Sequence, residues 1–206
     1  MSVRNEKEKA LDAYLAASAR LGDRRALGRL AERWHPKLLA HAWRLTGERE
    51  LAADVTQEAW IQIMKGIPGL NETDAFAAWA FQIVTRRCAH HIKRRQRQRV
   101  GNAMLARQPE ARPDEAAGNE DQADLATIRA AMSELPSEQR AALGLFYLEG
   151  LRIAEIAVAL NVAPGTIKTR LMHARNKLRA HLQHQSTMET PTRDSRVEGS
   201  LKGDKT

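Results

Sequence analysis

Hydrophobic positions follow a helical period through two stretches of the 206-residue chain. The first stretch runs from residue 23 to about residue 99 and is dense in Leu, Ala, Trp and Ile; the second runs from about 122 to 185. No segment alternates polar and apolar residues with the two-residue period of a half-buried strand. The pattern therefore predicts an all-α protein of two small helical domains, without a β-sheet.

The segments outside these stretches lose the hydrophobic period. Residues 100–121 contain two prolines and five acidic residues, which is typical of a flexible acidic linker. The stretch at 186–206 is polar and contains Pro191 and two glycines, so we expect a disordered tail. The predicted organisation is a first domain at 22–99, the linker at 100–121, a second domain at 122–185 and the tail at 186–206.

Glycines, prolines and capping residues predict where the helices begin and end. An amphipathic segment at 6–21 is a candidate for an additional helix ahead of the first domain. In the first domain we expect helices over 23–46, 48–65 and from 73 or 74 to 99, and in the second over 123–134, 137–149, 153–160 and 164–182.

The formal net charge of +8 indicates a polyanionic partner, either nucleic acid or an acidic membrane surface. Cys88 is the only cysteine, which excludes an internal disulfide and a multi-cysteine zinc site. No stretch approaches the roughly 20 apolar residues that a membrane-spanning helix needs, and the N-terminus lacks an apolar signal core. We therefore expect a cytoplasmic protein without membrane insertion.

The second domain contains the pattern of a helix-turn-helix. A short apolar helix at 153–160 is followed by a tight turn, and Pro164 stands at the first turn of the next helix, where its missing N–H costs nothing. One stripe of that helix is apolar, and its opposite side is polar and basic, which suits the major groove of DNA. A solvated basic helix in an ordinary bundle is the alternative. The stripe is Ile167, Leu171, Ala174 and Leu178, and the outer residues are Thr166, Lys168, Thr169, Arg170, Met172, His173, Arg175, Asn176 and Lys177.

The helix predicted at 48–65 has one apolar side and one acidic, amide-bearing side. DNA phosphates would repel such a surface, so it suits a protein partner, although a solvated face fits the chemistry equally well. The inward residues are Leu51, Ala52, Val55, Ala59 and Ile63, and the outward residues are Asp54, Gln57, Glu58 and Ile61.

The last helix of the first domain is strongly basic, and no acid interrupts it from Gln82 to Arg99. A one-sided cationic helix binds phosphates with a steep salt dependence. A membrane-surface helix is less suitable, because the aromatics lie at the N-terminal end and not opposite the charge. Two buried edges are expected, Phe76, Trp79 and Ile83 on one and Phe81, Val84, Cys88 and Ile92 on the other. The basic side carries Gln82, Arg86, His90, Lys93 and Arg97, widened by Arg87, Arg94, Arg95 and Arg99.

Motifs in both domains point to one family. The second domain carries Leu135 and Pro136, the run 146–151, the triplet 155–157 and the run 165–171, which together resemble region 4 of sigma-70-type factors. The first domain carries an Asp-x-x-Gln-Glu-x-aromatic motif at 54–60, which resembles region 2 of the same family. The compact extracytoplasmic-function (ECF) group is the best match. The resemblance implies a sigma factor that binds core RNA polymerase, directs it to specific promoters and assists promoter melting.

The resemblance also implies roles for individual residues. It places Asp54, Gln57 and Glu58 against the clamp helices of the largest polymerase subunit, with Ile61 on the same side and Trp60 in the core. Region 4 would bind the −35 element, with Thr169, Met172 and His173 near bases and Lys168, Arg170 and Arg175 near the backbone. The basic helix would read and help to melt the −10 element through Trp79, Gln82, Arg86, His90, Lys93, Arg94 and Arg97.

Three positions depart from the family pattern. Arg86 and His90 occupy positions where the family commonly has Asn and Asp, and His173 replaces a usual Arg. These changes predict altered promoter recognition. The family further implies that the acidic linker lies in a basic polymerase channel and that an anti-sigma factor covers one or both domains.

Two other classes of protein are alternatives. A stand-alone helix-turn-helix regulator would carry a ligand, receiver or dimerisation domain in place of the first domain. A DNA-acting enzyme needs clustered carboxylates or a nucleophile beside basic groups, and neither Tyr14 nor Tyr147 has such a cluster in sequence. Adjacent His90 and His91 diverge by about 100° on a helix, so they cannot chelate together. We therefore expect no catalytic residue, no metal site and no cofactor.

Overall fold

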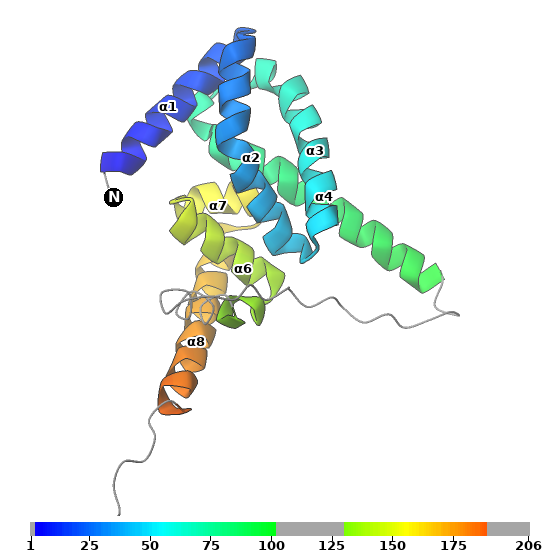
Figure 1. Ribbon diagram of the computed structural model, residues 1–206, viewed down its shortest axis with the longest axis vertical. Coiled ribbons are helices and arrows are strands. Elements are labelled where there is room, and N and C mark those ends of the chain that lie inside the picture. The colour runs from blue at the N-terminus through cyan, green and yellow to red at the C-terminus, as the bar shows by residue number, and fades with distance from the viewer. Residues whose placement is uncertain (1–2, 102–129, 189–206) are drawn as a thin grey trace, which may run out of the picture.

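The computed structural model describes residues 3–101 and 130–188, and this part of the chain is built from helices and short turns without a strand (Figure 1). The first helical block contains α1 (Val3–Arg20), α2 (Arg24–Thr46), α3 (Arg49–Gly66) and α4 (Phe76–Gly101), with 3₁₀ turns at Ile67–Gly69 and Thr73–Ala75. The second block contains α6 (Ser137–Leu143), a π-helical turn (Gly144–Leu148), α7 (Ile153–Leu160) and α8 (Pro164–Met188). The all-α prediction is confirmed.

The ends of α2 show how local sequence determines a helix. The Asp23 carboxylate accepts hydrogen bonds from the backbone N–H groups of Arg25 (2.8 Å) and Ala26 (3.1 Å), which would otherwise be unsatisfied at the helix start. Gly47 has a left-handed backbone (φ 74°), and its N–H donates to the Trp43 carbonyl at 2.8 Å. The helix predicted at 23–46 therefore has close to its expected bounds, with Asp23 as its N-cap and Gly47 as its C-cap.

Helix α1 belongs to the core of the first block. Leu15, Ala16 and Ala19 are buried, and the buried Asp12 carboxylate pairs with Arg33 Nε of α2 at 2.8 Å. The predicted domain boundary at residue 22 therefore leaves out a helix that the fold includes. The sequence showed the amphipathic pattern of α1 but not the surface that its apolar side covers.

The aromatic centre of the first block joins α2 to α4. The Trp34 ring meets Phe76 edge-on at 5.2 Å and Phe81 at 5.5 Å between centroids. The two buried edges predicted for α4 are only partly confirmed, because Trp79, Ile83 and Ile92 are half-buried. The five inward residues predicted for α3 are all buried: Leu51, Ala52, Val55, Ala59 and Ile63.

The second block forms the predicted helix-turn-helix. Helix α7 has the predicted bounds, and Asn161 turns the chain with a left-handed backbone (φ 54°). The predicted helix at 137–149 is instead α6 followed by the π-helical turn. That turn lies against the first block, where a Cβ on Gly144 would stand 2.7 Å from Arg44 Nε, so a larger residue there would require the Arg44 side chain to shift.

Several predicted segments lie at the limits of the described residues. Helix α4 continues through Gly101, two residues into the predicted linker, and α8 continues through Met188, three residues into the predicted disordered tail. The first helical block therefore extends to residue 101 and the second to residue 188. Residues 102–129 and 189–206 lie outside the described part, and of the helix predicted at 123–134 only 130–133 is described as helical.

The two blocks pack directly against each other, a contact that the sequence did not predict. Figure 1 shows α6 and α7 against α2 and α4, whereas α8 and the C-terminal half of α4 project outward. One hydrophobic cluster includes buried residues of both blocks. The polar contacts include Gln82 Nε2 donating to the Val158 carbonyl at 2.9 Å and Lys37 Nζ lying 3.5 Å from Glu149 Oε2.

Candidate polymerase-binding and nucleic-acid interfaces

The basic residues of α4 fall into two rows with different surroundings. Arg87, His91 and Arg95 face α3 and form what we call the charge seam. Arg87 Nη1 lies 3.1 Å from Glu58 Oε2, and His91 Nε2 lies 3.2 Å from both Glu58 carboxylate oxygens. Arg95 pairs with Glu48 at the start of α3. The seam holds these three side chains against α3, so they are not free phosphate contacts.

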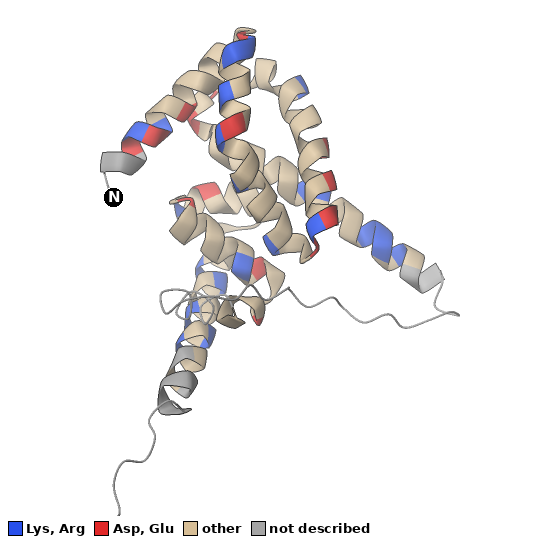
Figure 2. Cartoon of the chain, viewed as in Figure 1, with Lys and Arg blue, Asp and Glu red and all other residues tan. Residues whose placement is uncertain are grey.

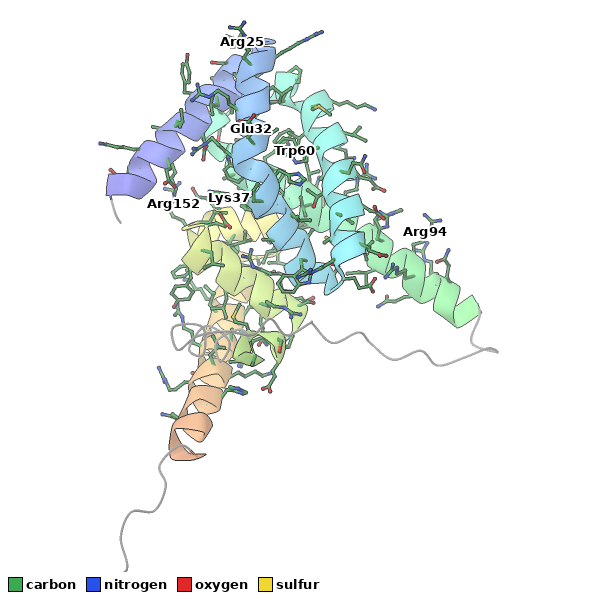
Figure 3. The ribbon with its side chains drawn as sticks, in the orientation of Figure 1. Arg25, Glu32, Lys37, Trp60, Arg94 and Arg152 are labelled. Carbon is green, nitrogen blue, oxygen red and sulfur yellow. The ribbon has the colours of Figure 1, made fainter. Side chains whose placement is uncertain are left out.

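The second row of α4 points to solvent. Its members are exposed and, in the described part of the chain, form no ion pair. Figure 2 shows blue on this projecting part of α4, and Figure 3 shows Arg94 directed away from the rest of the molecule. This second row, which we call the outer cationic row, is therefore available to bind phosphates. Its members are Arg86, His90, Lys93, Arg94 and Arg97.

The N-terminal part of α4 differs from the prediction. Gln82 was expected beside the basic residues, but it is half-buried and its side-chain amide donates to Val158 of α7. The Trp79 ring packs over Gly66, where a Cβ would come within 2.8 Å of Trp79 Cζ2. In this arrangement Gln82 is engaged by the second block and cannot read a base.

The outer side of α3 presents the predicted acidic and amide surface. Asp54, Gln57 and Ile61 are exposed, with Ile61 at 45% of its full accessibility. Glu58 is less free, since it joins the charge seam. Met64, exposed at 48%, extends the apolar part of this side three residues beyond Ile61. Sequence reasoning missed it, although its spacing from Ile61 was a usable signal.

Helix α8 presents the predicted outer side. Ile167, Leu171 and Ala174 are buried against the rest of the second block, and Leu178 is half-buried. The Thr169 hydroxyl donates to the Gly165 carbonyl at 3.1 Å, which leaves its oxygen as an acceptor. The residues predicted near DNA that are exposed here are Thr166, Lys168, Thr169, Met172, His173 and Arg175.

Two arginines of α8 are held within the second block. Arg170 Nη2 lies 2.9 Å from Glu138 Oε2 of α6, and its side chain is only 19% exposed. Arg175 Nε donates to the Tyr147 hydroxyl at 2.9 Å, and its guanidinium stacks over Phe146. Arg170 thus braces α8 on α6 and is not a free backbone contact, whereas Arg175 stays exposed while stacked.

Burial alters the titration of groups inside the first block. Burial, followed by the charge of Arg44, lowers the pKa of His41 from 6.5 to about 3. Burial also raises the pKa of the Cys88 thiol to about 12, so the reactive thiolate is absent at neutral pH. Cys88 is therefore a small core residue, as predicted.

Comparison with known proteins identifies the family. The description "Sigma-70 region 2" matches residues 30–98, and "Sigma-70, region 4" matches residues 125–178. The ECF RNA polymerase sigma factor SigM of Mycobacterium tuberculosis is 30% identical over 85% of this chain and 87% of its own. The chain belongs to the ECF family of sigma factors. The RNA polymerase sigma-H factor of Pseudomonas aeruginosa is 27% identical over 84% of this sigma factor and 94% of its own length.

Solved structures share the fold of this sigma factor. The sigma factor RpoE, in a complex with the anti-sigma factor NepR from Bartonella quintana, gives a TM-score of 0.63 at 24% identity over 76% of this chain and 96% of its own. CnrH, in a complex with the cytosolic domain of CnrY, gives a TM-score of 0.58 at 23% identity over 84% and 98%. At these identities the likeness supports the all-α architecture alone.

Family membership establishes the general function. The chain is a transcription initiation factor that directs RNA polymerase, and none of the matches indicates an enzyme family. The region 2 match spans α3 and most of α2 and α4, and the region 4 match includes α6, α7 and the first part of α8. Among the described helices, none combines the length and the apolar character needed to cross a bilayer.

Proposed function

We propose that the outer side of α3 binds core RNA polymerase, while α4 and α8 bind the −10 and −35 promoter elements. One observation carries this proposal: acidic and amide groups are exposed on α3, and unpaired cations are exposed on the two projecting helices. Figure 2 shows red along α3, with blue near its two ends, and blue on the projecting part of α4 and on the first half of α8.

The charges argue for these assignments. On the side of α3 that carries Asp54 and Gln57, an exposed cation, Lys65, appears only in the last turn of the helix. The surface around Asp54 and Gln57 therefore repels phosphates and favours a basic protein surface, with Ile61 and Met64 as apolar contacts. The outer cationic row attracts the DNA backbone and releases counterions on binding. Met172 and His173 are the exposed central residues of α8 and are suited to contact base edges.

Promoter binding requires the two blocks to separate. Gln82 of α4 and Pro164 at the start of α8 line one surface pocket, so α8 begins close to the second turn of α4. Two elements about 25 base pairs apart are separated by about 85 Å of B-form DNA, at 3.4 Å per base pair. A chain that binds both at once therefore has to break contacts between the blocks, among them the bond from Gln82 to Val158.

An anti-sigma factor is the second partner that we infer. The solved structures of RpoE and CnrH show those sigma factors in complexes, the first of them with an anti-sigma factor. Since this chain shares their fold, we infer a partner of the same kind. Because promoter binding requires the blocks to separate, a protein that stabilises their packed arrangement would prevent it. A cytoplasmic location follows from the proposal, since RNA polymerase acts there.

Charge reversal on α3 tests the polymerase assignment. We expect the D54K/Q57K variant to lose binding to core polymerase in a pull-down, because it places two cations where a basic surface is to dock. Binding of the isolated chain to DNA should persist. A stand-alone regulator would instead bind promoter DNA specifically without polymerase, and retention of polymerase by the variant would refute the assignment of α3.

A further inference from the structure

The proposed polymerase surface and the proposed DNA helix share one ion-pair cluster. Glu58 lies on the outer side of α3, one helical turn from Asp54 and from Ile61. Its carboxylate is occupied by Arg87 and His91 of α4, at 3.1 and 3.2 Å. Any basic group of a partner that docks on this side of α3 has to compete with these two side chains.

We propose that Glu58 couples the two binding events: it holds Arg87 and His91 on the α3 side of α4 until a polymerase cation replaces them. The exchange frees the Arg87 guanidinium, which is a permanent cation, for the DNA backbone. This inference rests on the proposed function, because it takes α3 as the polymerase surface and α4 as the DNA surface.

The helix geometry places Arg87 next to the outer cationic row. At about 100° per residue, Arg94 and Arg87 point within about 20° of each other around the α4 axis, seven residues and two turns apart. Once released from Glu58, Arg87 would extend the row by one cation without any movement of the backbone. The Glu58 and Arg87 side chains are 39% and 32% exposed, so both are accessible to a partner from outside.

The strength of the pair suits an exchange. An ion pair as exposed as that of Glu58 with Arg87 shifts the equilibrium between the paired and the separated side chains by no more than about fivefold. A well-placed partner charge can therefore replace Arg87. Coupling between two binding sites is reciprocal. DNA that attracts Arg87 therefore also frees Glu58 for polymerase.

Asp54 provides a matched control for Glu58. It lies on the same side of α3, one turn earlier, it is exposed, and the described residues give it no ion-pair partner. Asp54→Asn and Glu58→Gln remove the same charge from nearly the same place. Only the second change releases Arg87.

The experiment measures binding of the isolated full-length chain to a fluorescent single-stranded oligonucleotide over a range of salt concentrations. For E58Q we expect two- to fivefold tighter binding at low salt, within the about fivefold limit for such a pair. The plot of log affinity against log salt should steepen by about 0.7, the value for one added phosphate contact on a single strand. The double variant E58Q/R87A should return to the wild-type slope. Circular dichroism melting verifies that each variant is folded.

Three results would overturn the proposal. If D54N and E58Q tighten binding equally, the effect is one of general charge and not of the seam. If E58Q/R87A keeps the gain, or if E58Q shows none, Arg87 is not the released group. None of these measurements uses polymerase, so they are independent of the pull-down that tests the proposed function.

The reciprocal measurement uses core polymerase and the R87A variant, whose Glu58 has lost one competing partner. We expect R87A to bind core polymerase more tightly than the wild type, by up to about fivefold. Equal or weaker binding would contradict the coupling while leaving α3 as the docking surface, which D54K/Q57K tests separately.

Discussion

His41 is a fully buried histidine whose two ring nitrogens have different surroundings. The Thr85 hydroxyl donates to the Phe81 carbonyl at 3.0 Å, so its oxygen accepts from His41 Nε2, also at 3.0 Å. Nδ1 is buried and has no partner among the described residues. The neutral ring with its proton on Nε2 is therefore the form that this site stabilises, which agrees with the lowered pKa.

This histidine makes stability depend on pH. Between pH 6.5 and about 3 the unfolded chain binds a proton at His41 that the folded chain excludes. The free energy of unfolding therefore falls as the pH drops below 6.5, by about 1.4 kcal/mol per pH unit from this group. Urea unfolding at several acidic pH values should show this slope reduced in H41F. The exposed variant H173Q should keep the wild-type slope, and an unchanged slope in H41F would contradict the assignment.

At the scale of an element, caps and braces decide where helices begin and how they lie. Asp23 satisfies two N–H groups at the start of α2, and Arg170 ties α8 to α6 through Glu138. The first of these is local in sequence, and the second joins residues 32 positions apart. Only the first kind is visible in a sequence pattern.

Removal of the Asp23 cap tests how much this local contact at the start of α2 contributes to the stability of the fold. We expect Asp23→Ala to lower the free energy of unfolding by about 1 kcal/mol, because two backbone donors lose their acceptor. Chemical denaturation measures this. Asp74→Ala is the matched control, since Asp74 is an exposed acid that makes no hydrogen bond or ion pair in the described residues. Equal losses in the two variants would mean that the cap itself contributes nothing.

At the scale of the whole molecule, the contact between the blocks places polar groups where water is largely excluded. The Glu149 side chain is 8% exposed and lies near both Lys37 and Arg44 of α2. Burial lowers the pKa of Arg44, the nearby Glu149 charge opposes this shift, and Arg44 Nη1 has no hydrogen-bond partner in the described chain. An interface with such a group separates more readily than an apolar core.

Neutralising Glu149 should loosen this contact. In E149Q the half-buried Arg44 loses the compensating charge of Glu149, at a cost of about 1–3 kcal/mol. We expect a larger radius of gyration in small-angle X-ray scattering and faster amide exchange in α7, with each block still helical. E134Q is the control, because Glu134 pairs with His181 inside the second block. Unchanged dimensions of E149Q would show that apolar packing alone holds the blocks together.

The sequence by itself determined the helices and the family. Asp23, Gly47 and Pro164 act through neighbours along the chain, and the spacing of Ile167, Leu171 and Ala174 is a property of one helix. Tertiary structure alone decided that α1 joins the core, that Gln82 is held by Val158, and that Glu58 is paired with Arg87. These outcomes depend on which helices meet and at what distance, and a periodic pattern contains the direction of a side chain but not the residue that faces it.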